Sequence, residues 1–184
     1  MAEAKFAQFK LMATYAYGYG FTAFLVHNSL TCGANLLWTV LWITITEMYA
    51  KRGYLPEELH IQLDNCFGEN KNNTMIAMCA WLVATFKFRR VRVFFLHKGH
   101  THVIIDQVFG VITTFIKYMR IVTVEDLCRC IDESMLQNPQ YEAKAVRELR
   151  SIYDFSRFVK DEMGGTNTLS NHEDQSVSGE SVRE

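Results

Sequence analysis

Hydrophobic and polar positions follow two different periods along this chain. Residues 9–19 and 21–25 are rich in aromatic and aliphatic side chains and flank a glycine-containing turn, which predicts two paired strands. Residues 58–63 place an apolar side chain at every second position, and residues 91–96 form a short, mainly apolar run. Both patterns are typical of strands in a core sheet.

Other segments have the spacing of helices. Residues 33–52 repeat apolar side chains every three to four positions and stop at Gly53, which favours a helix end. Residues 75–88 are apolar on nearly all sides, as expected for a buried helix. Thr101 is a favourable N-cap for a helix over residues 102–120.

The last third of the chain has a different character. Thr123 and Asp126 resemble the capping box that begins a short helix, and the charged, amphipathic residues 142–161 predict a surface helix. The end of the chain is rich in Gly, Ser, Asn and Glu, which predicts a disordered tail. These boundaries divide the chain into a core over residues 1–122, a helical extension over 123–163 and a tail over 164–184.

The order of predicted elements defines the fold class. It is strand, strand, helix, strand, helix, strand, helix, followed by further helices. Strands that alternate with helices are usually parallel neighbours joined by crossovers. The sequence therefore predicts an α/β fold with a mixed sheet flanked by helices.

Composition limits the classes of function. The 184 residues are 49% hydrophobic and 13% aromatic, enough for one domain with a packed core. The net charge of -1 gives no overall attraction to nucleic acid or anionic membranes, so any nucleic-acid binding must rest on a local patch. The longest apolar runs are shorter than the roughly 20 residues that cross a bilayer. With no secretory signal and an odd number of cysteines, five, we expect a soluble protein of the nucleus or cytoplasm that is not secreted and not bound to membranes.

Polar residues cluster where two predicted strands end. Residues 64–72 follow strand 58–63, and residues 99–107 follow strand 91–96 at a short distance. Buried polar groups are costly unless they are paired or bind a ligand, and ligands of α/β sheets gather at the carboxyl ends of strands. We therefore expect the two segments to form one site.

Asp64 and Asp106 are the candidate catalytic and metal-binding residues of this site. Two neighbouring carboxylates favour a divalent cation between them, and oxygen ligands suit Mg²⁺ or Mn²⁺. His102 lies four residues before Asp106, on the same helix face, and is a further candidate ligand. Carboxylate-bound metal at strand ends is the arrangement used for phosphoryl transfer. Four polar residues are candidates for shaping the site or contacting phosphate: Asn65, Glu69, Asn70 and Lys71.

Each candidate also has a simpler interpretation. The segment around Asp64 has the composition of a turn with a helix cap, and Asp106 fits a solvated helix position. His97, His100 and His102 could instead form a Zn²⁺ site, although three such closely spaced histidines rarely face one centre. Residues 86–92 form a basic run with interleaved aromatic residues. Such a run could contact phosphates, but it is more commonly the solvated edge of a strand. Its arginines are Arg89, Arg90 and Arg92.

Two motifs in these segments resemble a poorly characterised family of transposon-derived domains. The first is Gln-Leu-Asp-Asn-x-x-x-Glu-Asn-Lys-Asn at residues 62–72. The second is Gly-His-Thr-His-x-x-Ile-Asp-Gln-x-Phe at residues 99–109, preceded by Phe-Leu at 95–96. The resemblance covers about residues 1–120.

The resemblance implies an RNase H-like fold, as in integrases and DDE transposases. In such a fold Asp64 and Asp106 match the second and third acids of a metal-binding triad, and His100 becomes a residue that supports the site or handles protons. The first strand and its acid are expected just before Lys5 and are missing from this sequence. We therefore expect the chain to be inactive or weakly active on its own, as part of a larger transposon-derived protein.

Three functions remain open on sequence alone. The leading hypothesis is a transposase-like or integrase-like nuclease domain that acts on DNA phosphodiesters with Mg²⁺ or Mn²⁺. The second is a non-catalytic module of the same origin that binds nucleic acid or protein. The third, weaker hypothesis is a Zn²⁺-dependent hydrolase.

Overall fold

The structure is a computed structural model that describes residues 9–63, 72–96, 104–138 and 145–163. These residues form a mixed α/β arrangement of two small sheets and five helices. The α/β prediction is confirmed at this level, but the strands lie in two separate sheets where the sequence predicted one mixed sheet.

The first sheet has three strands in the order β1-β2-β5. Strands β1 (Phe9–Ala16) and β2 (Gly20–His27) form an antiparallel hairpin, as predicted. Gly18 and Gly20 adopt φ values of 74° and 97° in the turn, a region that favours glycine. Strand β5 (Ala145–Leu149) adds to the other side of β2 in parallel. Strand β2 is thus the central strand of this sheet.

The second sheet consists of two parallel strands, β3 (Glu58–Leu63) and β4 (Arg90–Phe95). Helix α3 (Asn73–Ala84) connects them and covers one face with Met75, Met78 and Leu82. The predicted helix over residues 75–88 ends early, since Phe86 adopts a left-handed conformation with φ of 55°.

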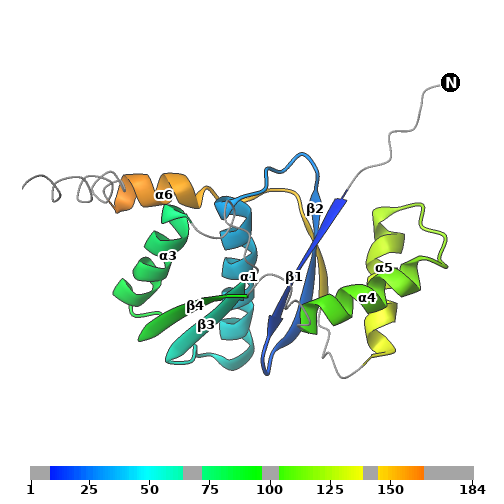
Figure 1. Ribbon diagram of the computed structural model, residues 1–184, viewed down its shortest axis with the longest axis horizontal. Helices are drawn as coiled ribbons and strands as arrows, with labels where there is room; N and C mark the ends of the chain where they lie inside the picture. Colours follow the sequence, from blue (N-terminus) through cyan, green and yellow to red (C-terminus); the bar gives the residue numbers. More distant parts are fainter. Residues whose placement is uncertain (1–8, 64–71, 97–103, 139–144, 164–184) are drawn as a thin grey trace, which may run out of the picture.

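Helix α1 (Ala34–Arg52) lies between the two sheets (Figure 1). Leu36 and Val40 join a buried cluster with residues of β2, whereas Trp38 and Ile45 join a second cluster with β3 and α3. The helix ends at Gly53, whose N–H donates a 2.7 Å hydrogen bond to the Tyr49 carbonyl. Contacts on opposite sides explain why this helix is apolar without a single polar face.

Helices α4 (Ile104–Ile116) and α5 (Val124–Leu136) cover the other face of the first sheet. Side chains alternate along β2, so Phe21, Ala23 and Leu25 face these helices while Phe24 and Val26 face α1. Val108 and Ile112 are the buried residues of α4. The first sheet is therefore the middle of three layers, with α1 on one side and α4 and α5 on the other.

The last described segment corrects the prediction of one helix over residues 142–161. Residues 145–149 form β5, and only Phe155–Glu162 form a helix, α6. Val146 and Leu149 are three residues apart, a spacing that mimics a helix, but in the strand they pack into clusters on opposite faces of the sheet. Figure 1 shows α6 lying across the ends of α1 and α3.

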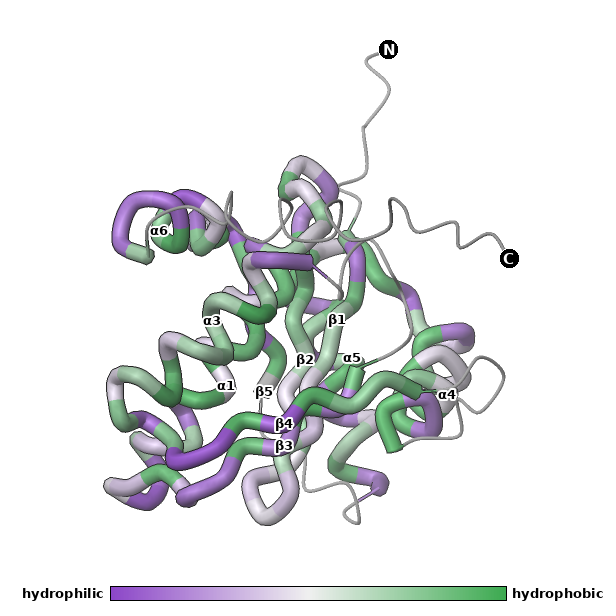
Figure 2. The backbone as a smooth tube through the Cα atoms, turned by 60° about the vertical axis from the view of Figure 1, so that its left-hand side comes forward, coloured by the Kyte–Doolittle hydropathy of each residue, from purple (hydrophilic) through white to green (hydrophobic). Residues whose placement is uncertain are grey.

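Hydropathy follows this layering. Figure 2 shows hydrophobic residues along much of α1 and α3 and hydrophilic residues at the beginning of β3 and β4. Within the described ranges, none of the helices is both long and apolar enough to span a membrane.

Candidate functional site

The exits of β3 and β4 lie next to each other. The two strands pair in register from Glu58 opposite Arg90 to Leu63 opposite Phe95. The Leu96 N–H then donates a 3.0 Å hydrogen bond to the Leu63 carbonyl, so the pairing continues to the residue that follows β4. Asp64 is the next residue in the sequence after Leu63. The last described residues before the two polar segments of the predicted site, Leu63 and Leu96, are therefore neighbours.

Asp106 is the one predicted metal ligand that the structure describes. It lies in the first turn of α4 with its side chain exposed, while Val108 and Ile112 anchor the helix to β2. In Figures 1 and 2 the carboxyl end of β4 faces the region where α4 begins. The fold thus directs the start of α4 towards the strand exits.

Most other predicted site residues lie outside the described ranges. The structure does not test whether they converge on Asp106. They are Asp64, Asn65, Glu69, Asn70, Lys71, His97, His100 and His102.

A cavity of about 380 Å³ lies beside the strand exits. Its lining comes from the start of α3 and from Val93 and Phe95 of β4. Asn72 caps α3, because its Oδ1 accepts a 2.9 Å hydrogen bond from the Met75 N–H. Burial raises the pKa of the Cys79 thiol in the lining to about 11, so this cysteine is not a thiolate at neutral pH. The cavity is mainly apolar and suits a hydrophobic group better than a metal.

The residues present supply only part of a metal site. Among the residues that the structure describes, no group of three or more His, Cys, Asp or Glu side chains is placed to hold a metal ion. An exposed carboxylate in the first turn of α4 is a suitable oxygen donor for Mg²⁺ or Mn²⁺, but a single donor does not define a coordination geometry.

The predicted basic segment is described completely. Arg89 donates to Glu57 and Glu58 at 3.1 and 3.0 Å, and Arg90 and Arg92 approach Glu58 at 3.4 and 3.8 Å. A hydrogen bond from His60 and then the nearby arginines lower the pKa of Glu58. The arginines are therefore paired with acidic residues as well as exposed to solvent.

The sequence patterns did not identify His60 and Phe94, which lie on the same face of the β3–β4 sheet as the arginines of β4. The parallel register places His60 opposite Arg92 and Gln62 opposite Phe94. The period of two in both strands was a sufficient signal for the face, but the register that joins them depends on the packed structure.

A family model described as a domain of unknown function, DUF7869, matches residues 3–178. The mixed α/β chain belongs to this family. Neither the curated proteins nor the solved structures contain a significant match.

Proposed function

We propose that this chain is a transposase-derived domain of RNase H-like fold that acts on DNA phosphodiesters with Mg²⁺ or Mn²⁺. The observation that supports this proposal best is that β3 and β4 end side by side, joined by the hydrogen bond between Leu96 and Leu63. Both strands end facing the start of α4. This arrangement brings the end of β3, the end of β4 and the first turn of α4 to one region of the molecule. Asp64 and Asp106 are the proposed ligands, with His102 beside them.

The topology supports the fold assignment. An antiparallel hairpin is followed by helix, parallel strand, helix, parallel strand and helix, which is the order that the resemblance implies after its first strand. The strand pairing differs from the proposed fold, since β1 and β3 lie in two separate sheets where that fold has one mixed sheet.

The metal proposal is tested by calorimetry with Mn²⁺ on the whole chain. We expect wild-type protein to bind Mn²⁺, and Asp64→Asn and Asp106→Asn each to weaken binding by about tenfold or more, since each removes a charged ligand. Asp161→Asn is the matched control, because this exposed carboxylate of α6 pairs with Arg157 away from the strand exits. Equal affinity in all four proteins, or no binding to the wild type, contradicts a shared metal.

A second candidate is a non-catalytic module of the same origin that binds nucleic acid. The exposed arginines on β4 favour it, and it does not require a complete set of acids. It predicts DNA binding that weakens with salt, without Mn²⁺-dependent cleavage. Cleavage that is lost in Asp106→Asn contradicts this candidate and supports the nuclease.

A further inference from the structure

We propose that the solvent-facing side of the β3–β4 sheet binds single-stranded nucleic acid, with Phe94 and His60 stacking on bases and arginines contacting phosphates. This inference rests on the proposed function for the class of ligand, and it adds the form of nucleic acid and the surface that binds it. For convenience we call this surface the β4 face. It consists of Glu58, His60, Gln62, Arg90, Arg92 and Phe94.

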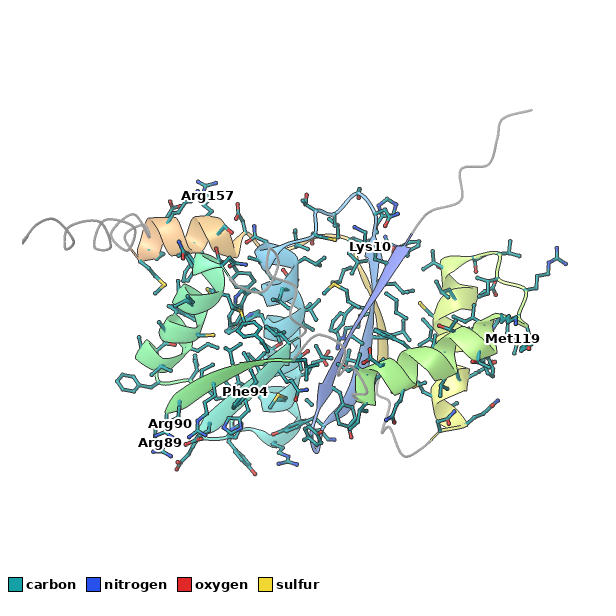
Figure 3. The ribbon with its side chains drawn as sticks, viewed as in Figure 1. Lys10, Arg89, Arg90, Phe94, Met119 and Arg157 are labelled. Carbon is teal, nitrogen blue, oxygen red and sulfur yellow. The ribbon has the colours of Figure 1, made fainter. Side chains whose placement is uncertain are left out.

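The β4 face is open to solvent. Alternate residues of the two strands, including Ile61, Val91 and Val93, pack into the core under α3 and α1. The remaining positions point away from this core, and Phe94 is 49% exposed. Figure 3 shows Arg89 and Arg90 at the beginning of β4 and Phe94 further along the strand. Phe94 is therefore one of the large hydrophobic side chains that the structure leaves open to solvent.

Two aromatic rings on this face lie next to each other. The ring centroids of His60 and Phe94 are 5.8 Å apart, with planes at 69°. The side chain of His60 is 52% exposed, so both rings are accessible. Aromatic side chains on the open face of a sheet are the platforms on which proteins stack unpaired bases.

Charge on and beside the face favours phosphate. Arg89, Arg90 and Arg92 stand against Glu57 and Glu58, and three arginines with two glutamates leave a charge of +1 with His60 neutral. The side chains of Arg90 and Arg92 are 49% and 45% exposed. Exposed ion pairs contribute little to stability, so these arginines can exchange Glu58 for a phosphate.

The geometry favours a single strand over a duplex. The bases of a duplex are stacked on each other, and their flat faces are not available to Phe94 or His60. A single strand can turn its bases onto the rings and keep its phosphates beside the arginines.

Fluorescence anisotropy tests the proposal with labelled oligothymidylate of about 15 nucleotides, compared with a duplex of the same length. We expect the wild type to bind the single strand more tightly. Phe94→Ala should weaken this binding about tenfold. Phe94→Leu keeps an apolar side chain but removes the ring, so it should weaken binding to the same extent and serves as the test if the alanine variant folds poorly. Arg92→Ala should weaken binding and reduce its salt dependence by about one phosphate contact.

A gain-of-binding variant makes the test sharper. Glu58→Gln removes the charge that competes with phosphate for the three arginines, so we expect severalfold tighter binding at low salt. Arg157→Ala is the charge control, because Arg157 lies on α6 on the opposite side of the molecule (Figure 3). We expect this control to bind like the wild type.

Three results would overturn the inference: wild-type affinity in both Phe94 variants, tighter binding to duplex than to single strand, or no binding to oligothymidylate at all. Failure of the metal proposal can be distinguished from failure of the single-strand proposal. In that case Asp106→Asn and the wild type show the same Mn²⁺ affinity, while binding of the single strand still depends on Phe94.

Discussion

Asn35 at the start of α1 binds Ser156 at the start of α6, 121 residues later in the chain. The Asn35 Oδ1 accepts hydrogen bonds of 2.8 Å from the Ser156 N–H and 3.0 Å from its hydroxyl. The Asn35 Nδ2 also donates to Asp154, the N-cap residue of α6, at 3.0 Å. One amide thus ties the end of the described chain to the helix that separates the two sheets.

Replacing this amide should destabilise the protein. We expect Asn35→Ala to lower the free energy of unfolding by about 2 kcal/mol, because it leaves partly buried polar groups without a partner. Urea denaturation measures the change. Thr114→Ala is the control: its hydroxyl bonds to the carbonyl of Gly110 within an exposed part of α4, so the effect should stay within about 0.5 kcal/mol. Equal stability of Asn35→Ala and wild type would show that α6 is held by its apolar contacts alone.

The position of α4 depends on Ile112. This side chain is 2% exposed and packs in the cluster that contains Phe21 and Leu25 of β2. We expect Ile112→Ala to cost about 2–5 kcal/mol, from lost burial and the cavity left behind. Ile76→Ala, at a position 66% exposed on α3, should change stability by less than about 0.5 kcal/mol in the same assay. Similar losses in the two variants would contradict the observed packing of α4.

The capping box of α5 should make stability depend on pH. The Asp126 carboxylate accepts hydrogen bonds from the N–H groups of Thr123 and Val122 at 3.1 and 3.2 Å. The Thr123 hydrogen bond, that of Val122 and nearby Arg129 lower the pKa of Asp126 from 3.8. A lowered folded-state pKa contributes stability above the unfolded pKa, and this contribution is lost as the pH falls through the folded value.

Asp126→Asn keeps an acceptor but removes the charge. We therefore expect wild type to be the more stable protein at neutral pH, and the difference to disappear as the pH falls well below 3.8. Thermal melts followed by circular dichroism at several pH values measure this. A difference that is constant across the pH range would show that the charge of Asp126 does not contribute.

The thiols should differ in reactivity. Burial raises the pKa of Cys79 to about 11, and the thiolate is the reactive form. Cys32 is exposed, with Lys10 Nζ 2.9 Å from its sulfur. At about pH 8 we expect iodoacetamide to label exposed Cys32 faster than partly buried Cys79, as measured by mass spectrometry of peptides. Equal labelling rates in the folded protein would contradict the partial burial of Cys79.

The local patterns in the sequence predicted much of the fold. Alternation in residues 58–63 and the apolar run at 91–96 correctly indicated β3 and β4, because both strands bury one face. The capping box at Thr123 was also correct, since its donors and acceptors lie within four residues. The same local reasoning misread β5, where Val146 and Leu149 have helical spacing but belong to clusters on opposite sheet faces.

Local sequence patterns could predict only part of the candidate site. Asp106 was placed correctly at the start of a helix, because N-terminal helix signals are local. The sequence could not show that Glu58 would pair with the three arginines or that His60 and Phe94 would share a face. Those contacts depend on the parallel register of β3 and β4, which lie about 30 residues apart in the chain.

The sequence by itself determined most of the strands and helices, because burial of one face imposes a period on the residues; β5 is the exception. Tertiary structure alone decided that β5 joins β2, that α1 separates two sheets and that Asn35 binds Ser156. Such long-range pairings depend on shape and hydrogen-bond geometry between distant segments, and neither is encoded in the spacing of neighbouring residues.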